Sequence, residues 1–368
     1  MRVKSLKNII LSIFTAFSLF FGFEAKASDE GHGGEKKFDI STMIFHHISD
    51  AHEWHFATIG ETHISLSLPV ILYSSDKGLE IFSFSRLKTH EGQPTVYLDY
   101  SLDHHGKIIC TSPGREFFSF MPDPHASHQE GATRIYNISI TKNIASLFLS
   151  VLILFAVFIP VAKGYATRKG NAPKGIQSFF EPIIVFIRDE IALPNIGAKS
   201  ERYMPFLLTV FFFIWFNNLL GLIPGGANLT GNIAVTFSLA FITLLITVFS
   251  GNRDYWMHIL WTPGIPMWLR PIMLPVELVG IISKPFSLMV RLFANITAGH
   301  VIILSLLGLT FIFQSIGVGV AATLFSTVMS LLELFVAILQ AYVFTLLSAM
   351  YFGQATAEHE HDHSDGHH

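Results

Sequence analysis

Long apolar runs separated by short polar segments dominate the chain from residue 143 onward, and they predict membrane-spanning helices. A helix needs about 20 apolar residues to cross a bilayer. The last two runs are longer than that, so we expect two steeply tilted helices at the C-terminal end. The five predicted spans are 143–162, 203–223, 230–249, 276–313 and 318–351. The predicted fold class is an all-α polytopic membrane protein, preceded by an N-terminal segment with some β structure.

The N-terminal part of the chain has a different pattern. Residues 1–27 combine a basic start, an apolar stretch and the tripeptide Ala25-Lys26-Ala27, which together are typical of a cleaved signal peptide. An uncleaved anchor helix is the alternative. Either form exports the next segment, 28–140, out of the cytoplasm. Short apolar and β-branched runs between turn residues predict strands in this segment. They fall at 64–73, 79–84 and 95–102.

Flanking charges give the predicted membrane domain, 141–353, its orientation. The loop after the first span is rich in Lys and Arg, so the positive-inside rule places it in the cytoplasm. Within that loop, 176–191 mixes apolar and charged residues in a pattern that suits a helix lying on the membrane surface. Five crossings from an outside start then place the acidic, histidine-rich tail, 354–368, in the cytoplasm.

Composition supports a membrane protein and narrows the chemistry. The chain of 368 residues is 51% hydrophobic and 14% charged, with mean hydropathy +0.48, which is too apolar for an ordinary soluble domain. A net charge of −3 gives no sign of a nucleic-acid partner. Cys110 is the single cysteine, so an intrachain disulfide and a thiolate metal site are both excluded. No Walker-type nucleotide loop occurs, and we assign no cofactor.

A histidine-rich piece at 46–56 invites a metal interpretation. It does not form the HExxH zinc motif, because the position that would complete His52-Glu53 is Phe56. A zinc or copper site is the alternative here, and a solvated structural segment is the favoured interpretation. We therefore assign no metal ligand.

One charge inside the fourth predicted span carries the functional argument. Arg291 is the only permanently charged residue between Pro285 and Phe313. A guanidinium does not lose its proton, and placing one in mid-membrane costs roughly 2.5–3.5 kcal/mol on insertion scales. Residues three, four and seven apart share a helix face. By that spacing Arg291 lies on one stripe with four other polar residues, namely Glu277, Lys284, Ser287 and Asn295.

The fifth predicted span carries a single acid, Glu333, and one amide, Gln340, seven residues further on the same face. A carboxylate in the membrane is costly when ionised, so it either pairs or takes a proton. His300 of the fourth span lies about half a turn round from Arg291 and is the obvious partner. Asn218 in the second span is either an interhelical hydrogen-bonding group or a channel-lining amide.

The motif Ser-Lys-Pro-x-Ser-x-x-x-Arg-Leu-Phe-x-Asn-x-x-Ala-Gly, which occupies 283–299, resembles the signature of subunit a of F-type ATP synthases. The resemblance extends over about 143–353. It assigns the family's essential arginine to Arg291 and its asparagine to Asn295. It also assigns the family's upstream acid and lysine to Glu277 and Lys284. Asn218 matches a family asparagine at the outer half-channel.

The resemblance implies a Glu/His couple in the last two spans. Many family members place the acid on the fourth helix and the histidine on the fifth. Here the order is reversed, with His300 on the fourth and Glu333 on the fifth. An exchange of this kind keeps the total charge and proton capacity of the pair, and it therefore predicts a contact between the two side chains.

The resemblance further implies a proton-channel subunit of the bacterial inner membrane, which is not an enzyme by itself. Its implied partners are a ring of c subunits, the b-subunit peripheral stalk, the remaining ATP synthase and the lipid membrane. Protons would enter from outside near Asn218, His300, Glu333 and Gln340, and neutralise a ring carboxylate that Arg291 attracts. They would leave near Glu277, Lys284 and Ser287.

Two other classes compete with this interpretation. An ion-coupled secondary transporter usually shows internal repeats, and none is evident between 143–250 and 276–351. An intramembrane hydrolase would need a nucleophile or metal motif, which the sequence lacks. Neither class explains a lone arginine on a stripe of Ser, Lys and Asn.

Overall fold

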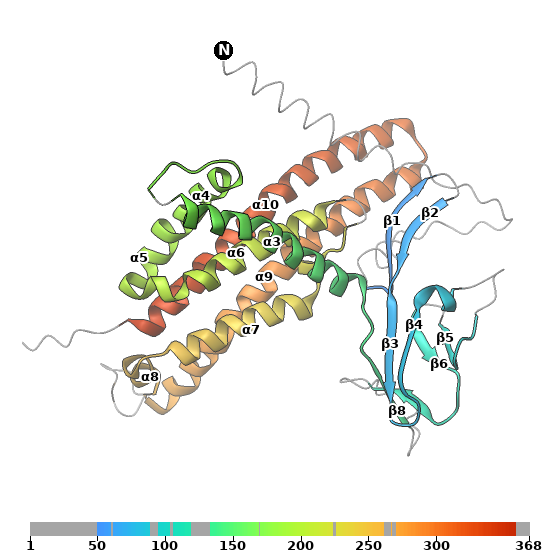
Figure 1. Ribbon diagram of the computed structural model, residues 1–368, viewed down its shortest axis with the longest axis horizontal. Coiled ribbons are helices and arrows are strands. Elements are labelled where there is room, and N and C mark those ends of the chain that lie inside the picture. Colours follow the sequence, from blue (N-terminus) through green and yellow to red (C-terminus); the bar gives the residue numbers. More distant parts are fainter. Residues whose placement is uncertain are drawn as a thin grey trace, which may run out of the picture. The chain divides into compact units, whose positions relative to one another are not determined.

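The computed structural model describes residues 50–59, 62–88, 95–103, 106–118, 133–168, 170–223, 226–260, 266 and 270–357. The predicted signal peptide, residues 46–49 of the histidine-rich piece and residues 358–368 of the predicted tail lie outside these residues. The chain divides into two compact units (Figure 1). The N-terminal unit contains Ser49–Ser146, and the membrane unit contains Leu147–Ile223 and the residues after Asn228.

The N-terminal unit is built from short strands. A four-stranded sheet has the order β4-β3-β8-β7, in which only β7 and β8 are parallel. Two hairpins, β1-β2 and β5-β6, complete the unit. The strands are β1 (Glu53–Ile59), β2 (Thr62–Ser67), β3 (Pro69–Ser74), β4 (Gly78–Ser83), β5 (Tyr100–Leu102), β6 (Ile108–Cys110), β7 (Arg115–Phe117) and β8 (Thr133–Asn137). One face of the sheet packs a core of Val70, Leu72, Phe82, Tyr100 and Ile135.

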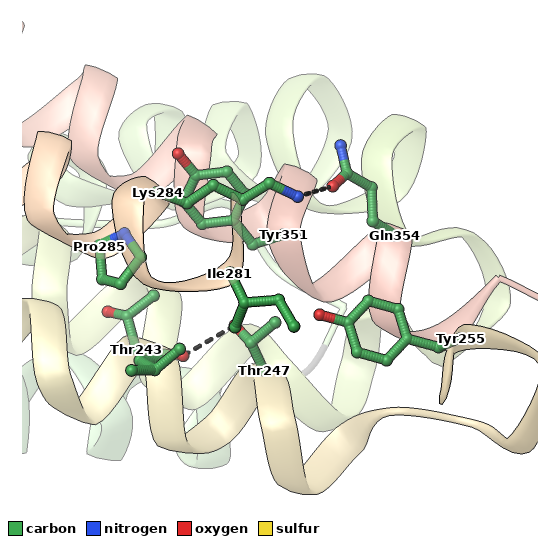
Figure 2. Close-up of a pocket in the computed structure, with 9 residues that line it drawn as sticks. Thr243, Thr247, Tyr255, Ile281, Lys284, Pro285, Tyr351 and Gln354 are labelled. Carbon is green, nitrogen blue, oxygen red and sulfur yellow. Dashed lines mark hydrogen bonds between the residues drawn. The ribbon is translucent and has the colours of Figure 1, made fainter. Parts of the chain in front are cut away.

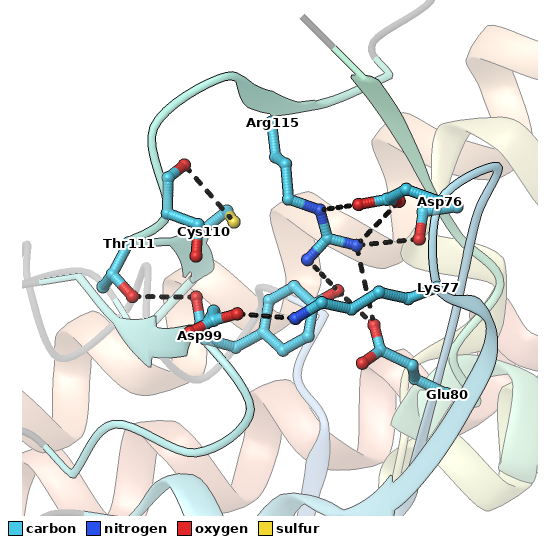
Figure 3. Close-up of polar contacts among 10 residues, drawn as sticks. Asp76, Lys77, Glu80, Asp99, Cys110, Thr111 and Arg115 are labelled. Atoms are coloured by element: carbon cyan, nitrogen blue, oxygen red, sulfur yellow. Dashed lines mark hydrogen bonds and ion pairs between the residues drawn. The ribbon is translucent and has the colours of Figure 1, made fainter.

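A buried arginine ties the strands of this unit together (Figure 3). The Arg115 side chain is only 7% exposed, and its Nε lies 2.9 Å from Asp76 Oδ2. Its Nη2 donates a hydrogen bond to Ser74 Oγ at 2.8 Å, while the Tyr100 hydroxyl donates to Glu80 Oε2 at 2.6 Å. Burial, and then the neighbouring Glu80 carboxylate, raise the pKa of Tyr100 above its usual value. A buried charge needs such partners, so this cluster is part of the core.

Two of the strand predictions need correction. The run predicted as one strand at 64–73 is two strands, β2 and β3, which are interrupted at Leu68. The interruption reflects different partners, because β2 pairs with β1 while β3 pairs with β4 and β8. The run at 95–102 is largely a turn, with positive φ at Leu98 and Asp99, and only Tyr100–Leu102 forms a strand.

Five helical segments of the described chain are long and apolar enough to cross a membrane, which confirms the predicted fold class. The last two, α9 and α10, run side by side (Figure 1). With 44 and 41 residues at 1.5 Å each they measure about 66 and 62 Å. That is about twice the hydrocarbon thickness, so these helices fit the bilayer only when they are steeply tilted. The helices are α3 (Lys142–Thr167), α4 (Ile176–Phe186), α5 (Leu193–Ile196), α6 (Ser200–Leu222), α7 (Ile233–Ser250), α8 (Arg253–Leu260), α9 (Arg270–Phe313) and α10 (Ile316–Thr356).

The helix predicted over 176–191 is confirmed and begins as α4 at Ile176, while its position on the membrane surface stays a prediction. A π-helical segment, Ile187–Ala192, continues it into α5, and the chain turns at Gly197, which has φ of 75°. Phe180 of α4 then contacts Phe212 and Phe216 of α6, with ring centroids 5.6 and 6.3 Å apart. Aromatic contacts of this kind place α4 alongside α6 rather than away from it.

Candidate proton-transfer site

His300 and Glu333 form a buried pair between α9 and α10. His300 Nδ1 lies 2.5 Å from Glu333 Oε1, which confirms the predicted contact. The two side chains are 15% and 4% exposed. The second imidazole nitrogen, Nε2, lies 3.1 Å from the carbonyl oxygen of Gly221 at the end of α6. The histidine is therefore held between two neighbouring helices.

The hydrogen bonds define the protons that this pair can hold. A backbone carbonyl only accepts, so His300 Nε2 must carry a hydrogen and donate it to Gly221. The contact between Nδ1 and Glu333 then contains one further proton. That proton lies either on the imidazole, giving a cation and a carboxylate, or on the carboxyl, giving two neutral groups. In both forms the pair is neutral overall, and one proton can be passed on.

A glycine allows the two helices to come this close. A Cβ atom built on Gly299 would lie 3.1 Å from both Cδ and Oε1 of Glu333. A side chain at that position would therefore displace the carboxylate. Glu333 Oε2 is also buried and has no hydrogen-bond partner among the described residues. The carboxyl thus has an unused oxygen beside the helix contact.

A second group of buried polar side chains lies next to this pair. Asn218 of α6 donates from Nδ2 to the carbonyl of Ala337 in α10 at 3.1 Å. The Thr230 hydroxyl donates to Asn218 Oδ1 at 2.6 Å. Gln340 is buried two turns along α10 from Glu333. Asn218 therefore forms an interhelical hydrogen bond, and its partner lies on α10, the helix that carries Glu333.

Sequence reasoning missed several of these groups. Neither Thr230 nor the Gly221 carbonyl was predicted, because nothing local marks them as partners of Asn218 and His300. Two buried serines, Ser326 and Ser330, precede Glu333 on the same face of α10. They lie seven and three residues before Glu333, a helical spacing that was a usable signal.

Arg291 lies on a different face of α9, and that face is exposed. Ser287 and Asn295, one turn to either side of it, are exposed as well. Apolar side chains accompany them, with Phe286 and Val290 exposed at 60% and 38%. Within the residues that the structure describes, no carboxylate pairs with Arg291. The cation thus lies on an outward-facing apolar surface, and the described residues supply no counter-charge to it.

Lys284 lies at the edge of a groove between α7, α8, α9 and α10 (Figure 2). Its Nζ donates to Gln354 Oε1 at 2.7 Å and lies 5.5 Å from the ring centroid of Tyr351. Gln354 is a further residue that sequence reasoning missed. The groove is partly open, and its cavity volume of about 10 Å³ has room for about one water molecule. Its polar lining consists of Thr243, Thr247, Tyr255, Lys284, Tyr351 and Gln354.

Glu277 is half-buried on the first turns of α9. Burial raises the pKa of Tyr255, and the negative charge of Glu277 raises it further. The Glu277 carboxylate thus influences Tyr255, one of the residues that line the groove. The structure thus separates the predicted residues into three places: the buried pair with Asn218 and Gln340, the exposed face of Arg291, and the groove at Lys284 with Glu277.

No group of three His, Cys, Asp or Glu side chains is close enough to hold a metal ion in the described part of the chain. His52, from the histidine-rich piece, stacks instead on Phe84 at 5.5 Å between ring centroids. Burial lowers its pKa below the usual value.

A polytopic helical protein with a buried acid–base pair and an unpaired cation on its outer face has the features of an ion-translocating membrane subunit. The chain belongs to the ATP synthase A chain family, whose model matches residues 144–353. This membership associates the chain with ATP synthesis and proton transport in a membrane.

Curated relatives agree with the family match. The chain is 48% identical to ATP synthase subunit a 2 of Chlorobaculum tepidum over 261 residues, which cover 68% of this chain and 71% of the relative. It is 44% identical to ATP synthase subunit a of Chloroherpeton thalassium over 63% of this chain and 71% of the relative. For ATP synthase subunit a of Myxococcus xanthus the identity is 43%, over 62% and 78%.

The N-terminal unit has a separate match. Residues 43–129 match a family described as a domain of unknown function, DUF8433. This region lies before the part that the ATP synthase A chain family covers.

Proposed function

We propose that this chain provides two offset proton half-channels and an essential arginine, Arg291, that couple proton flow to rotation of a c-subunit ring. In this role it is not an enzyme by itself. It conducts protons for a complex in which other subunits carry out the phosphoryl chemistry. A peripheral stalk of b subunits would hold it still against the ring.

The observation that carries the proposal is the exposed position of Arg291. A permanent cation on an apolar membrane face is costly unless a partner meets it. The described residues of its own chain offer no carboxylate to Arg291, so we infer that another subunit supplies the partner. A carboxylate on a neighbouring c subunit meets this need, since Arg291 favours its ionised form and lowers its pKa as it arrives.

The buried pair supports an inlet half-channel. His300 lies nine residues beyond Arg291, about 13 Å along the axis of α9. A proton that reaches His300 and Glu333 can be held there in a neutral pair. Asn218 and Gln340 line the same region with polar groups. From here a proton would neutralise the ring carboxylate, which can then turn into the lipid.

The groove at Lys284 supports an outlet half-channel. Lys284 lies seven residues before Arg291, about 10 Å along the helix in the opposite direction. Glu277 and Ser287 lie on the same part of α9, and Asn295 lies one turn past the arginine. The two half-channels are therefore offset along α9, with Arg291 between them. A fixed cation there repels protons and opposes a direct leak.

Lysine is not expected to replace the arginine. A buried lysine can lose its proton, whereas a guanidinium cannot.

The proposal is tested by ATP-driven acidification of inverted vesicles that contain Arg291→Gln. The sequence alternative, an ion-coupled secondary transporter, has no observation in its favour here.

Replacing Lys284 with methionine tests the outlet half-channel. Without its ammonium the groove is more apolar and less hydrated, so ATP-driven acidification should slow by about three- to tenfold. Gln354→Leu should have a smaller effect in the same direction, because it frees Lys284 without removing the charge. Lys163→Met, on an exposed part of α3, serves as the control. Unchanged pumping in Lys284→Met would remove the groove from the pathway.

We also propose that residues 1–27 are removed, that 28–140 is exported from a bacterial inner membrane and that the C-terminus is cytoplasmic. The basic loop after α3 supports this orientation. N-terminal sequencing of the mature subunit should give Ser28 as the first residue. A mature chain that still begins at Met1 would favour an uncleaved anchor.

A further inference from the structure

The four-stranded sheet of the N-terminal unit has one apolar face that its own core does not use. Cross-strand pairing places Ile81, Ile71 and Ile138 in one row across β4, β3 and the residue after β8. The next row on the same face contains Leu79, Tyr73 and Tyr136. Val70, Leu72 and Phe82 alternate with these residues and point into the core on the opposite face.

This outer face is exposed within the described residues. Ile81 and Ile138 are each 61% exposed, and Leu79 is 59% exposed. Its aromatic residues lie against one another, with Phe118 at 5.2 Å and Tyr73 at 6.4 Å from the ring of Tyr136. Soluble domains rarely leave a continuous apolar sheet face in water. The face therefore needs an occupant.

The sheet is fixed to the start of the first membrane helix. Only four residues separate the end of β8 from α3, and their backbone is hydrogen-bonded to β3. Ile138 and Ile140 donate to the carbonyls of Ile71 and Pro69 at 2.9 and 3.2 Å. The first residue of α3, Lys142, donates to the carbonyl of Ala51 at 2.8 Å. The connection is thus an extension of the sheet rather than a loose linker.

The length of α3 locates this connection relative to the bilayer. Its 26 residues measure about 39 Å, which is close to the 40–45 Å thickness of a bilayer with its headgroups. The start of α3 therefore lies at the headgroup level. Ile138 is four residues away, at most about 13 Å along an extended chain. On the first turn of α3, Ile144 is also exposed, at 40%.

We propose that this apolar face rests on the lipid surface at which α3 enters the bilayer. Its chemistry fits an interfacial contact, because isoleucine and leucine can enter the acyl boundary while tyrosine and phenylalanine occupy the headgroup layer. Arg134 lies over the Phe118 ring at 5.8 Å and adds a cation beside the aromatic residues, suited to lipid phosphate. The inference goes beyond the proton channel and holds for either orientation of the chain.

Spin labels on the assembled ATP synthase test this contact. Single-cysteine variants Leu79→Cys and Ile81→Cys, in a Cys110→Ser background, place the label on the face without removing core contacts. The complex is reconstituted in vesicles of phosphatidylethanolamine and phosphatidylglycerol. Relaxation by oxygen, which concentrates in lipid, is compared with relaxation by a water-soluble nickel chelate. Leu152→Cys on α3 is the lipid reference, and Lys107→Cys at the β5–β6 turn is the water reference.

The labels at 79 and 81 are expected to resemble the label at 152, with strong oxygen relaxation and weak nickel relaxation. Two outcomes would overturn the proposal. A label as accessible to nickel as that at 107 would show that the face is in water. A label that is immobile and shielded from both reagents would show that protein covers it. ATP-driven acidification by each variant serves as the control for an intact complex. The acidification rate does not depend on whether the sheet face lies in lipid, in water or against protein.

Discussion

Exchanging the buried pair, by His300→Glu together with Glu333→His, is expected to restore most of the proton transport that either single substitution removes. Each single change leaves two acids or two imidazoles at a site built for one of each. The pair can then no longer be neutral while holding one transferable proton. We expect each single variant to lose at least about tenfold in ATP-driven acidification, and the exchanged variant to return to within about fivefold of the original.

The measurement is a double-mutant cycle on membrane vesicles with equal amounts of assembled complex. Assembly is measured separately, because removing one partner of a buried ion pair also costs about 3–5 kcal/mol of stability. An exchanged variant that assembles fully and pumps no better than the poorer single variant would contradict the pair's role. It would mean that His300 and Glu333 act at their own positions and not as one proton-holding unit.

Much of the membrane unit could be predicted from the sequence, because the deciding signals are local. Apolar runs bounded by polar turns predicted the five spans, and most predicted ends lie within a few residues of the observed helix ends. The contact between His300 and Glu333 was predicted because a membrane carboxylate needs a partner, and because the family that the chain resembles has a Glu/His couple in these two spans. A helix period of 3.6 residues also correctly placed Arg291 and His300 on different faces.

The errors in helix limits have a physical cause. The fourth span was expected to begin at 276 because prolines crowd the region before it, yet α9 begins at Arg270. A proline in the first turn of a helix removes a donor that has no partner there anyway. Pro275 and Pro285 inside α9 are tolerated because neighbouring helices and side chains compensate for the lost hydrogen bonds in membrane proteins.

Contacts between distant segments could not be predicted. The partners of Asn218, His300 and Lys284 come from elements 12 to 119 residues away. Each depends on how far one helix is shifted along another, which no local pattern encodes. The apolar sheet face could not be predicted for the same reason. Ile81 and Ile138 lie in one row only because their strands pair on either side of β3.

Replacing Arg291 with glutamine is expected to abolish coupled transport while the complex still assembles. The substitution removes the only permanent charge from the outward face of α9 at this level. A ring carboxylate that loses its proton there would then have no counter-charge, and a cost of about 2.5–3.5 kcal/mol corresponds to about 70- to 400-fold in rate. Because Arg291 is exposed in its own chain, its removal leaves the helix contacts unchanged.

Arg188→Gln provides a matched control. Arg188 is also exposed, and its ion pair in the described chain is with the adjacent Asp189 at 2.7 Å. It lies in the π-helical segment after α4. Transport by this variant should stay close to that of the original complex. A large loss in both variants would point to damaged assembly rather than to a gate.

The most direct test of the account is ATP-driven acidification and ATP synthesis by inverted vesicles carrying Arg291→Gln, at equal amounts of assembled complex. The account predicts that both activities disappear while the subunit remains in the complex. Coupled transport that survives in this variant would contradict the central claim that Arg291 is the gate between the two half-channels.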